Sequence, residues 1–233
     1  FLKEQYQKLE AYTPGEQPRD MQYIKLNTNE FPYPPAPDVI DAINADVISD
    51  LRLYSDPECK QLKEAIASLY GVETENVYLS NGSDDILNFT FMAFFDKKGV
   101  VFLEISYGFY KVYADLYALD YKQIELCEDF SIDAADYMNT GRNVVIANPN
   151  APTGMTLSLD EIEEIVKSNP DNVVIVDEAY VDFGGESAVC LVDKYPNLLV
   201  TQTFSKSLSM AGARLGFAFA NEEIIKDLEK IKY

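Results

Sequence analysis

The chain has 233 residues and a formal net charge of −20, an acidic balance that argues against binding to nucleic acid or to an anionic membrane surface. It contains no histidine, which excludes Ser-His-Asp and Cys-His catalysis and histidine-ligated metal sites. Hydrophobic residues make up 47% of the sequence, enough for one large domain with a substantial core.

The cysteines indicate a reducing environment. Cys59, Cys127 and Cys190 are widely spaced, odd in number and form no metal-binding pattern, so neither a disulfide framework nor a metal site is expected. We also expect no signal peptide and no membrane-spanning segment. The sequence therefore predicts a cytoplasmic protein without membrane or nucleic-acid partners.

Apolar residues recur with helical and strand spacing in alternation along the chain. In the first half, we expect strands over 23–26, 77–80, 100–103 and 121–126, and helices over 37–45, 58–70, 86–95 and 110–118. In the second half, we expect strands over 144–147, 173–176, 198–200 and 215–220, a helix from the capping box at Ser158 to Asn169, and a helix over 221–233. This alternation predicts an α/β fold, with a mostly parallel sheet covered by helices on both faces.

A glycine turn joins the strand 77–80 to the next helix. Backbone N–H groups at such a turn are unpaired and the helix dipole is positive there, so Gly82, Ser83 and Asp84 could hold a phosphate. Ser83 is also expected to cap the helix. A plain capped helix without a ligand is the alternative interpretation.

An acidic residue ends the apolar run 173–176. Asp177 lies where open α/β sheets bind ligands, at the carboxyl end of a buried strand. The alternative is an aspartate that merely caps a helix or a turn.

A single lysine lies among small and hydroxylated residues after the run 198–200. Thr203, Ser205 and Arg214 carry groups suited to a phosphate, and Lys206 between them could lose its proton and act as a nucleophile. The alternative is a solvated loop lysine beside a solvated arginine.

Taken in order, these segments resemble the fold-type I, class II aminotransferases that use pyridoxal 5′-phosphate. Ser205, Lys206 and Arg214 resemble the segment that forms the Schiff base, and Asn148–Gly154 resembles the Asn-Pro-Asn-x-Pro-Thr-Gly signature. The similarity extends over essentially all of the chain, and histidinol-phosphate aminotransferases are the closer match.

The resemblance implies a role for each matched residue. Lys206 would bind the cofactor and move the substrate proton, Asp177 would pair with the ring nitrogen, and Tyr180 would contact the 3′ oxygen. The implied cofactor-binding residues are Tyr54, Gly82, Ser83, Asp84, Tyr107, Asn150, Asp177, Tyr180, Thr203, Ser205, Lys206 and Arg214. Tyr107 would stack on the ring, although core packing is the simpler interpretation of any one tyrosine among 16.

Two positions depart from the family pattern. Ala151 stands where the family has the asparagine that contacts the 3′ oxygen, and we expect the adjacent Asn150 to take over this contact. Phe31 replaces the second asparagine of the family's Asn-Glu-Asn-Pro-Tyr segment.

The resemblance also implies the domain organisation and the partners. It implies an N-terminal arm over 1–30, a cofactor-binding domain over 31–221, and a helix start over 222–233 that leads to a small C-terminal domain absent from this chain. Tyr54 would reach the phosphate of a neighbouring subunit, which requires a homodimer.

The implied reaction exchanges an amino group between histidinol phosphate and the 2-oxo acid 2-oxoglutarate, a step of histidine biosynthesis. Two alternatives stay open. One is a related enzyme of the same cofactor, such as a threonine-phosphate decarboxylase or an aromatic aminotransferase. The other is a non-catalytic protein or a fragment that does not turn over.

Overall fold

The computed structural model describes the chain except at residues 3–5, 8, 10–12, 14, 15, 17–19, 22, 23, 44 and 233. The expected arm over 1–30 therefore lies partly outside the described residues. Within the described part, no helix combines the length and the apolar character needed to cross a membrane.

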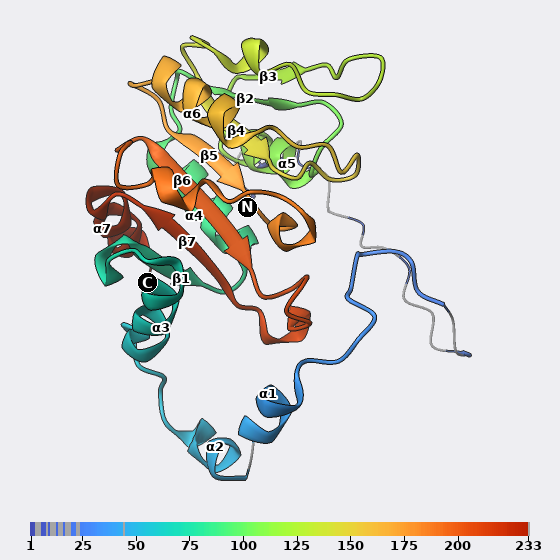
Figure 1. The fold of residues 1–233 in the computed structure, drawn as a ribbon, viewed down its shortest axis with the longest axis vertical. Coiled ribbons are helices and arrows are strands. Elements are labelled where there is room, and N and C mark those ends of the chain that lie inside the picture. The colour runs from blue at the N-terminus through green and yellow to red at the C-terminus, as the bar shows by residue number, and fades with distance from the viewer. Residues whose placement is uncertain are drawn as a thin grey trace.

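Among the described residues, a seven-stranded sheet has the order β1-β7-β6-β5-β4-β2-β3 (Figure 1). Its strands are β1 (Val77–Ser80), β2 (Val100–Leu103), β3 (Tyr121–Ile124), β4 (Asn143–Ala147), β5 (Val174–Asp177), β6 (Leu198–Thr203) and β7 (Gly216–Ala220). β7 pairs antiparallel with β1 and β6, and the other pairs are parallel. The prediction of a mostly parallel sheet is confirmed.

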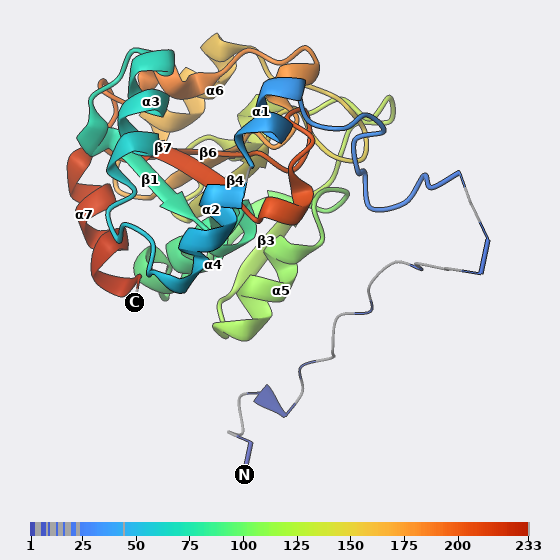
Figure 2. The ribbon, with the colours of Figure 1, turned by 90° about the horizontal axis from the view of Figure 1, so that it is seen from below.

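Helices cover both faces of the sheet, as predicted (Figure 2). The helices are α1 (Pro37–Ala42), α2 (Ala45–Ser49), α3 (Lys60–Tyr70), α4 (Ser83–Phe94), α5 (Phe109–Leu116), α6 (Leu159–Ser168) and α7 (Glu222–Ile231). Buried residues of α3 and α6 pack on one face, and those of α4, α5 and α7 pack on the other.

The strands divide their side chains between these two cores. In β4, Val144 and Ile146 face the core of α3 and α6, whereas Val145 and Ala147 face the other. This follows from the alternation of side chains along a strand. Because both faces are covered, the central strands contain continuous apolar runs, at 144–147 in β4, 174–176 in β5 and 198–200 in β6, and these runs located them in the sequence.

Both ends of α6 follow the sequence prediction, whereas the start of α4 and one expected strand differ from it. Ser158 and Glu161 form the predicted capping box of α6, and Asn169 follows its last residue. The prediction that Ser83 caps α4 is wrong: the helix begins at Ser83 itself, and Gly82 with φ 93° holds the cap position. The expected strand over 23–26 is also wrong, since residues 24–26 lie in irregular backbone and Tyr23 is outside the described residues.

Candidate functional site

A cavity of about 360 Å³ opens where β5 and β6 end, beside the first turn of α4. The carboxyl ends of parallel strands meet at one edge of the sheet, so residues far apart in sequence converge there. The predicted residues that line this cavity are Ser83, Asp84, Tyr107, Asp177, Tyr180, Thr203, Ser205, Lys206 and Arg214.

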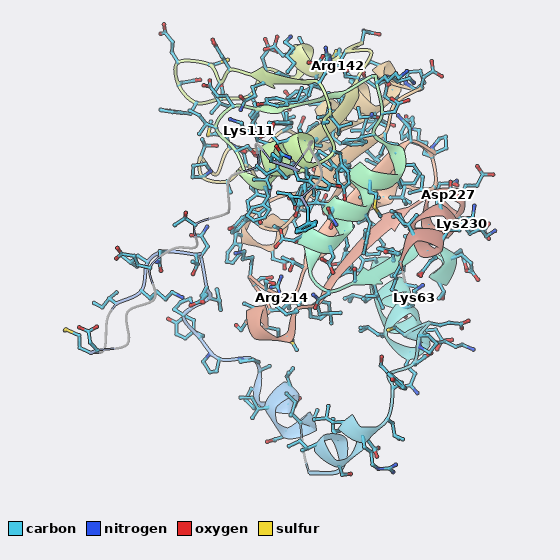
Figure 3. The ribbon with its side chains drawn as sticks, turned by 180° about the vertical axis from the view of Figure 1, so that it is seen from behind. Lys63, Lys111, Arg142, Arg214, Asp227 and Lys230 are labelled. Atoms are coloured by element: carbon cyan, nitrogen blue, oxygen red, sulfur yellow. The ribbon has the colours of Figure 1, made fainter. Side chains whose placement is uncertain are left out.

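The Arg214 guanidinium lies against the glycine turn at one end of the cavity. Figure 3 shows Arg214 on the loop between β6 and β7. A Cβ atom on Gly82 would lie 2.8 Å from Arg214 Nη2, so a side chain there would displace the guanidinium. Gly82 is thus packed behind Arg214. The carboxylate of Asp84 is 3.8 Å from Arg214 Nη2. The unpaired N–H groups of α4 and this guanidinium make the end of the cavity suitable for an anion.

A second glycine supports the same turn. A Cβ atom on Gly216, the first residue of β7, would lie 2.4 Å from both Gly82 C and Ser83 N. These are backbone atoms, so they cannot move aside as a flexible side chain would. β7 can therefore approach the turn only where it lacks a side chain.

Replacing Gly216 with alanine should destabilise the fold by about 3 kcal/mol, because overpacking against backbone forces the sheet and the turn apart. Urea unfolding measures this loss. Gly108 is the matched control: its φ is −61° and a Cβ atom there has no neighbour within 4 Å. A Gly216→Ala variant as stable as Gly108→Ala would contradict the prediction.

The Lys206 amine lies in the cavity beside Tyr180. Its Nζ is 5.5 Å from the centre of the Tyr180 ring and donates to Thr28 O at 3.3 Å. The Tyr180 hydroxyl in turn accepts from Asn29 Nδ2 at 2.8 Å. The segment that contains Thr28 and Asn29 therefore lies against these two groups at the side of the cavity.

Asp177 is buried and both of its oxygens are held. Tyr110 Oη donates to Oδ2 at 2.7 Å, and Ala179 N donates to Oδ1 at 3.3 Å. Burial raises the pKa of the Asp177 carboxyl to about 6, against the bond from Tyr110 and the nearby Lys206 charge, which lower it. The carboxylate can thus be ionised near neutral pH although it is 5% exposed.

The two tyrosines before and at the start of α5 extend this polar floor. Tyr107 Oη donates to Asp84 Oδ1 at 2.7 Å, and burial raises the Tyr107 pKa well above its usual value. Tyr110 lines the cavity as well, and the sequence analysis missed it. Its one sequence signal is its place three residues after Tyr107, which is weak among so many tyrosines.

Three predicted residues do not line this cavity: Gly82, which lies behind Arg214, and Tyr54 and Asn150. Tyr54 is fully exposed. Asn150 lines a second cavity of about 440 Å³, which shares Pro149, Ala151 and Tyr180 with the first. The Asn150 Nδ2 donates to the carbonyl of Ile105 and to Thr153 Oγ1 at 3.0 and 2.9 Å, and its buried Oδ1 has no hydrogen-bond partner among the described residues.

Glu178 is buried on the side of β5 opposite to Asp177. Its carboxylate accepts from Ser187 Oγ at 2.7 Å, Ala188 N at 2.6 Å and Gln202 Nε2 at 2.7 Å. Burial raises its pKa to about 7 from the ordinary 4.5, against these three bonds. Glu178 therefore fastens the segment after Tyr180 to β6.

This raised pKa predicts how stability depends on pH. The folded protein binds the Glu178 proton more tightly than the unfolded chain, so this contribution is complete below about pH 4.5 and is lost as the pH rises through about 7. Relative to Glu178→Gln, wild type should lose up to about 3 kcal/mol of stability between pH 4.5 and 8. Urea unfolding at several pH values measures this difference.

Glu163 is the control, because Lys194, Tyr195 and Lys167 lower its pKa to about 2. Its contribution has the opposite sign: it is present above the ordinary pKa and lost as the pH falls. A wild-type advantage over Glu178→Gln that grows with pH would contradict the assignment.

The described residues place no group of three or more Cys, Asp or Glu side chains for a metal ion. Their three cysteines are free.

Comparison with known proteins places the chain in context. Residues 21–233 match the family model described as aminotransferase class I and II. A histidinol-phosphate aminotransferase of Brachyspira hyodysenteriae is 54% identical over 235 residues, which cover 100% of this chain and 66% of that protein. Another, from Clostridium botulinum, is 56% identical over 225 residues, 96% of this chain and 64% of that protein. The chain thus spans about two thirds of the length of these relatives.

A solved structure agrees in fold. The histidinol-phosphate aminotransferase from Sinorhizobium meliloti, in complex with pyridoxal-5′-phosphate, has a TM-score of 0.80 and 24% identity. The match covers 88% of this chain and 58% of that one.

Proposed function

We propose that this chain, which belongs to the aminotransferase class I and II family, is the cofactor-binding part of a pyridoxal-phosphate-dependent aminotransferase. Its substrates would be histidinol phosphate and a 2-oxo acid, in histidine biosynthesis, as the names of its relatives suggest. One observation carries the proposal: Asp177, at the end of β5, lines the same cavity as Lys206 and Arg214, on the loop between β6 and β7. The activity would belong to the full-length protein.

The residues of the cavity fit this cofactor. Two cations, Arg214 and Lys206, line the cavity together with the acidic residues Glu30, Asp84 and Asp177, and Arg214 supplies a guanidinium for a phosphate at the glycine turn. Gly82 leaves room for the guanidinium at the glycine turn, where a Cβ atom would fill the space. Asp177 offers a buried carboxylate to a ring nitrogen, and Tyr107 offers an aromatic face.

Each residue then has a task in amino transfer. The bound cofactor supplies an electron sink that stabilises negative charge at the substrate α-carbon. Arg214 and the N–H groups of α4 would bind the phosphate, and Asp177 would hold the positive charge of the ring nitrogen. The Lys206 Nζ, as the nucleophilic amine of the cavity, takes up the proton that leaves the substrate α-carbon and returns it. Tyr180, whose ring lines the cavity beside Lys206, would contact the 3′ oxygen of the cofactor. Whether Asn150 shares this contact stays a prediction.

The N-terminal segment supports a homodimer as part of the proposal. α1 and α2 lie away from the sheet (Figure 1). The described part of the N-terminal segment exposes many apolar side chains. Ile24 is 91% exposed, Leu26 86% and Leu51 79%. Such a run of apolar side chains is typical of an interface. A second copy would cover it and bring Tyr54 to the neighbouring phosphate site. Sedimentation should give the mass of two chains, and a monomer would contradict this part.

We propose the same domain organisation that the sequence predicts: an arm over 1–30, a cofactor-binding domain over 31–221 and the start of a helix from 222. We also propose a cytoplasmic location, which the free cysteines favour.

The experiment uses purified full-length protein with added pyridoxal 5′-phosphate. Glutamate formation from 2-oxoglutarate is measured with histidinol phosphate, phosphothreonine or an aromatic amino acid as substrate. We expect the largest kcat/KM with histidinol phosphate. Release of carbon dioxide from phosphothreonine, or a preference for aromatic amino acids, would favour the related enzymes. Cofactor binding without turnover of any amine would favour a non-catalytic protein.

A further inference from the structure

Tyr110 lies beneath the cavity and has no task in the proposed function. Its side chain is fully buried, and its hydroxyl donates to Asp177 Oδ2 at 2.7 Å. It belongs to α5, whereas Asp177 ends β5, so the bond joins a helix on one face of the sheet to the strand end at the cavity.

The surroundings of Tyr110 leave its ring little freedom. Its centre is 6.0 Å from that of Phe102 and 5.6 Å from that of Tyr107, both in edge-on contact. With Ala179 N on the other carboxylate oxygen, the Asp177 side chain is fixed from two sides. A carboxylate held in this way keeps one orientation without rearrangement when a ligand arrives.

We propose that Tyr110 is a positioning residue, which aims the Asp177 carboxylate into the cavity and keeps it charged for the ring nitrogen of the cofactor. This rests on the proposed function, since it assigns Asp177 to that nitrogen. Tyr110 itself does not touch the cofactor in this role.

The charges around Asp177 explain why the bond matters. Asp84 on α4 and the neighbouring Glu178 oppose its ionisation, as burial does, while Lys206 after β6 favours it. The hydrogen bond from the Tyr110 hydroxyl also favours the ionised form of Asp177. Burial raises the Tyr110 pKa well above its usual value, so the hydroxyl remains a donor at all working pH values.

Replacing Tyr110 with phenylalanine removes only the hydroxyl. In the cofactor-free full-length protein, the Asp177 titration should move from about pH 6 to roughly pH 7 or above, because a hydrogen bond to a charged group is lost. NMR of carbon-labelled aspartate measures this midpoint, with Asp177→Asn to assign the signal. Cofactor affinity should fall about tenfold at pH 7 and by less at pH 9, where Asp177 is ionised in both proteins.

Tyr137 provides the matched control. It is also fully buried, and its hydroxyl has no hydrogen-bond partner among the described residues. Tyr137→Phe should leave both the Asp177 titration and the cofactor affinity unchanged. In the Asp177→Asn background, Tyr110→Phe should have little further effect on affinity, since Tyr110 acts through Asp177.

An unchanged Asp177 midpoint in Tyr110→Phe, or an equal shift in Tyr137→Phe, would overturn the proposal. An affinity loss that is the same at pH 7 and pH 9 would also overturn it, because it would indicate a merely structural role. Wild-type protein that does not bind the cofactor would instead refute the proposed function, and the cofactor-free titration would still test Tyr110.

Discussion

Replacing Lys206 with alanine should abolish covalent attachment of pyridoxal phosphate and slow amino transfer by at least ~10³-fold, since it removes a nucleophile and a proton carrier together. The amine faces the cavity that Asp177 and Arg214 also line. The sequence has no histidine, so no imidazole can take over the proton. Borohydride reduction followed by mass spectrometry of the Lys206 peptide measures attachment, and glutamate formation measures the rate.

Lys194 provides the control for this variant. It bonds Glu163 on the surface, away from the cavity, so Lys194→Ala should keep both attachment and activity. Attachment that persists in Lys206→Ala, or activity within about tenfold of wild type, would show that another amine carries the chemistry.

Replacing Asp177 with asparagine should lower kcat by about 10²-fold or more, because the amide has the shape of the carboxylate but cannot hold a positive ring nitrogen. The same variant should be no less stable than wild type. Burial raises the Asp177 pKa to about 6 from 3.8, so above pH 6 the folded protein holds a desolvated charge that the variant lacks. Steady-state kinetics and urea unfolding at pH 8 measure the two effects.

Asp120→Asn is the control, because Asp120 pairs with Arg142 on the exposed surface. It should change neither rate nor stability by much. An Asp177→Asn variant that is active but unstable would reverse both expectations, and would assign Asp177 to the fold rather than to the cofactor.

The sequence located the central strands closely because they are buried on both faces and contain continuous apolar runs. It also placed Lys206 and Asp177 together, since each follows a strand whose carboxyl end meets the same edge of the sheet. It gave no direction for β7, because an apolar run has the same composition in either orientation. The antiparallel pairing of β7 is visible only in the register with β1 and β6.

Single side chains were harder to predict than elements. Ser83 has the composition of a helix cap, but the φ of 93° at the cap position suits Gly82, so the helix begins at Ser83, one residue earlier than it would with a serine cap. Asn150 and Ala151 are adjacent in sequence, yet Ala151 lines the main cavity while Asn150 bonds away from it. The direction of each side chain depends on the backbone conformation of the whole turn, which the identity of the adjacent residues does not specify.

The loop between β6 and β7 fixes the distance along the chain between Lys206 and Arg214. Phe204 N donates a hydrogen bond to Leu215 O at 3.0 Å, which holds the two ends of the loop together. Lys206 and Arg214 lie near opposite ends of this loop. Because the hydrogen bond between Phe204 and Leu215 fixes the loop ends, a residue inserted between them would change the separation of the Lys206 amine from the Arg214 guanidinium. Most surface loops lengthen freely during evolution. If this loop holds the cofactor at both ends, as proposed, we expect insertions in it to impair cofactor binding.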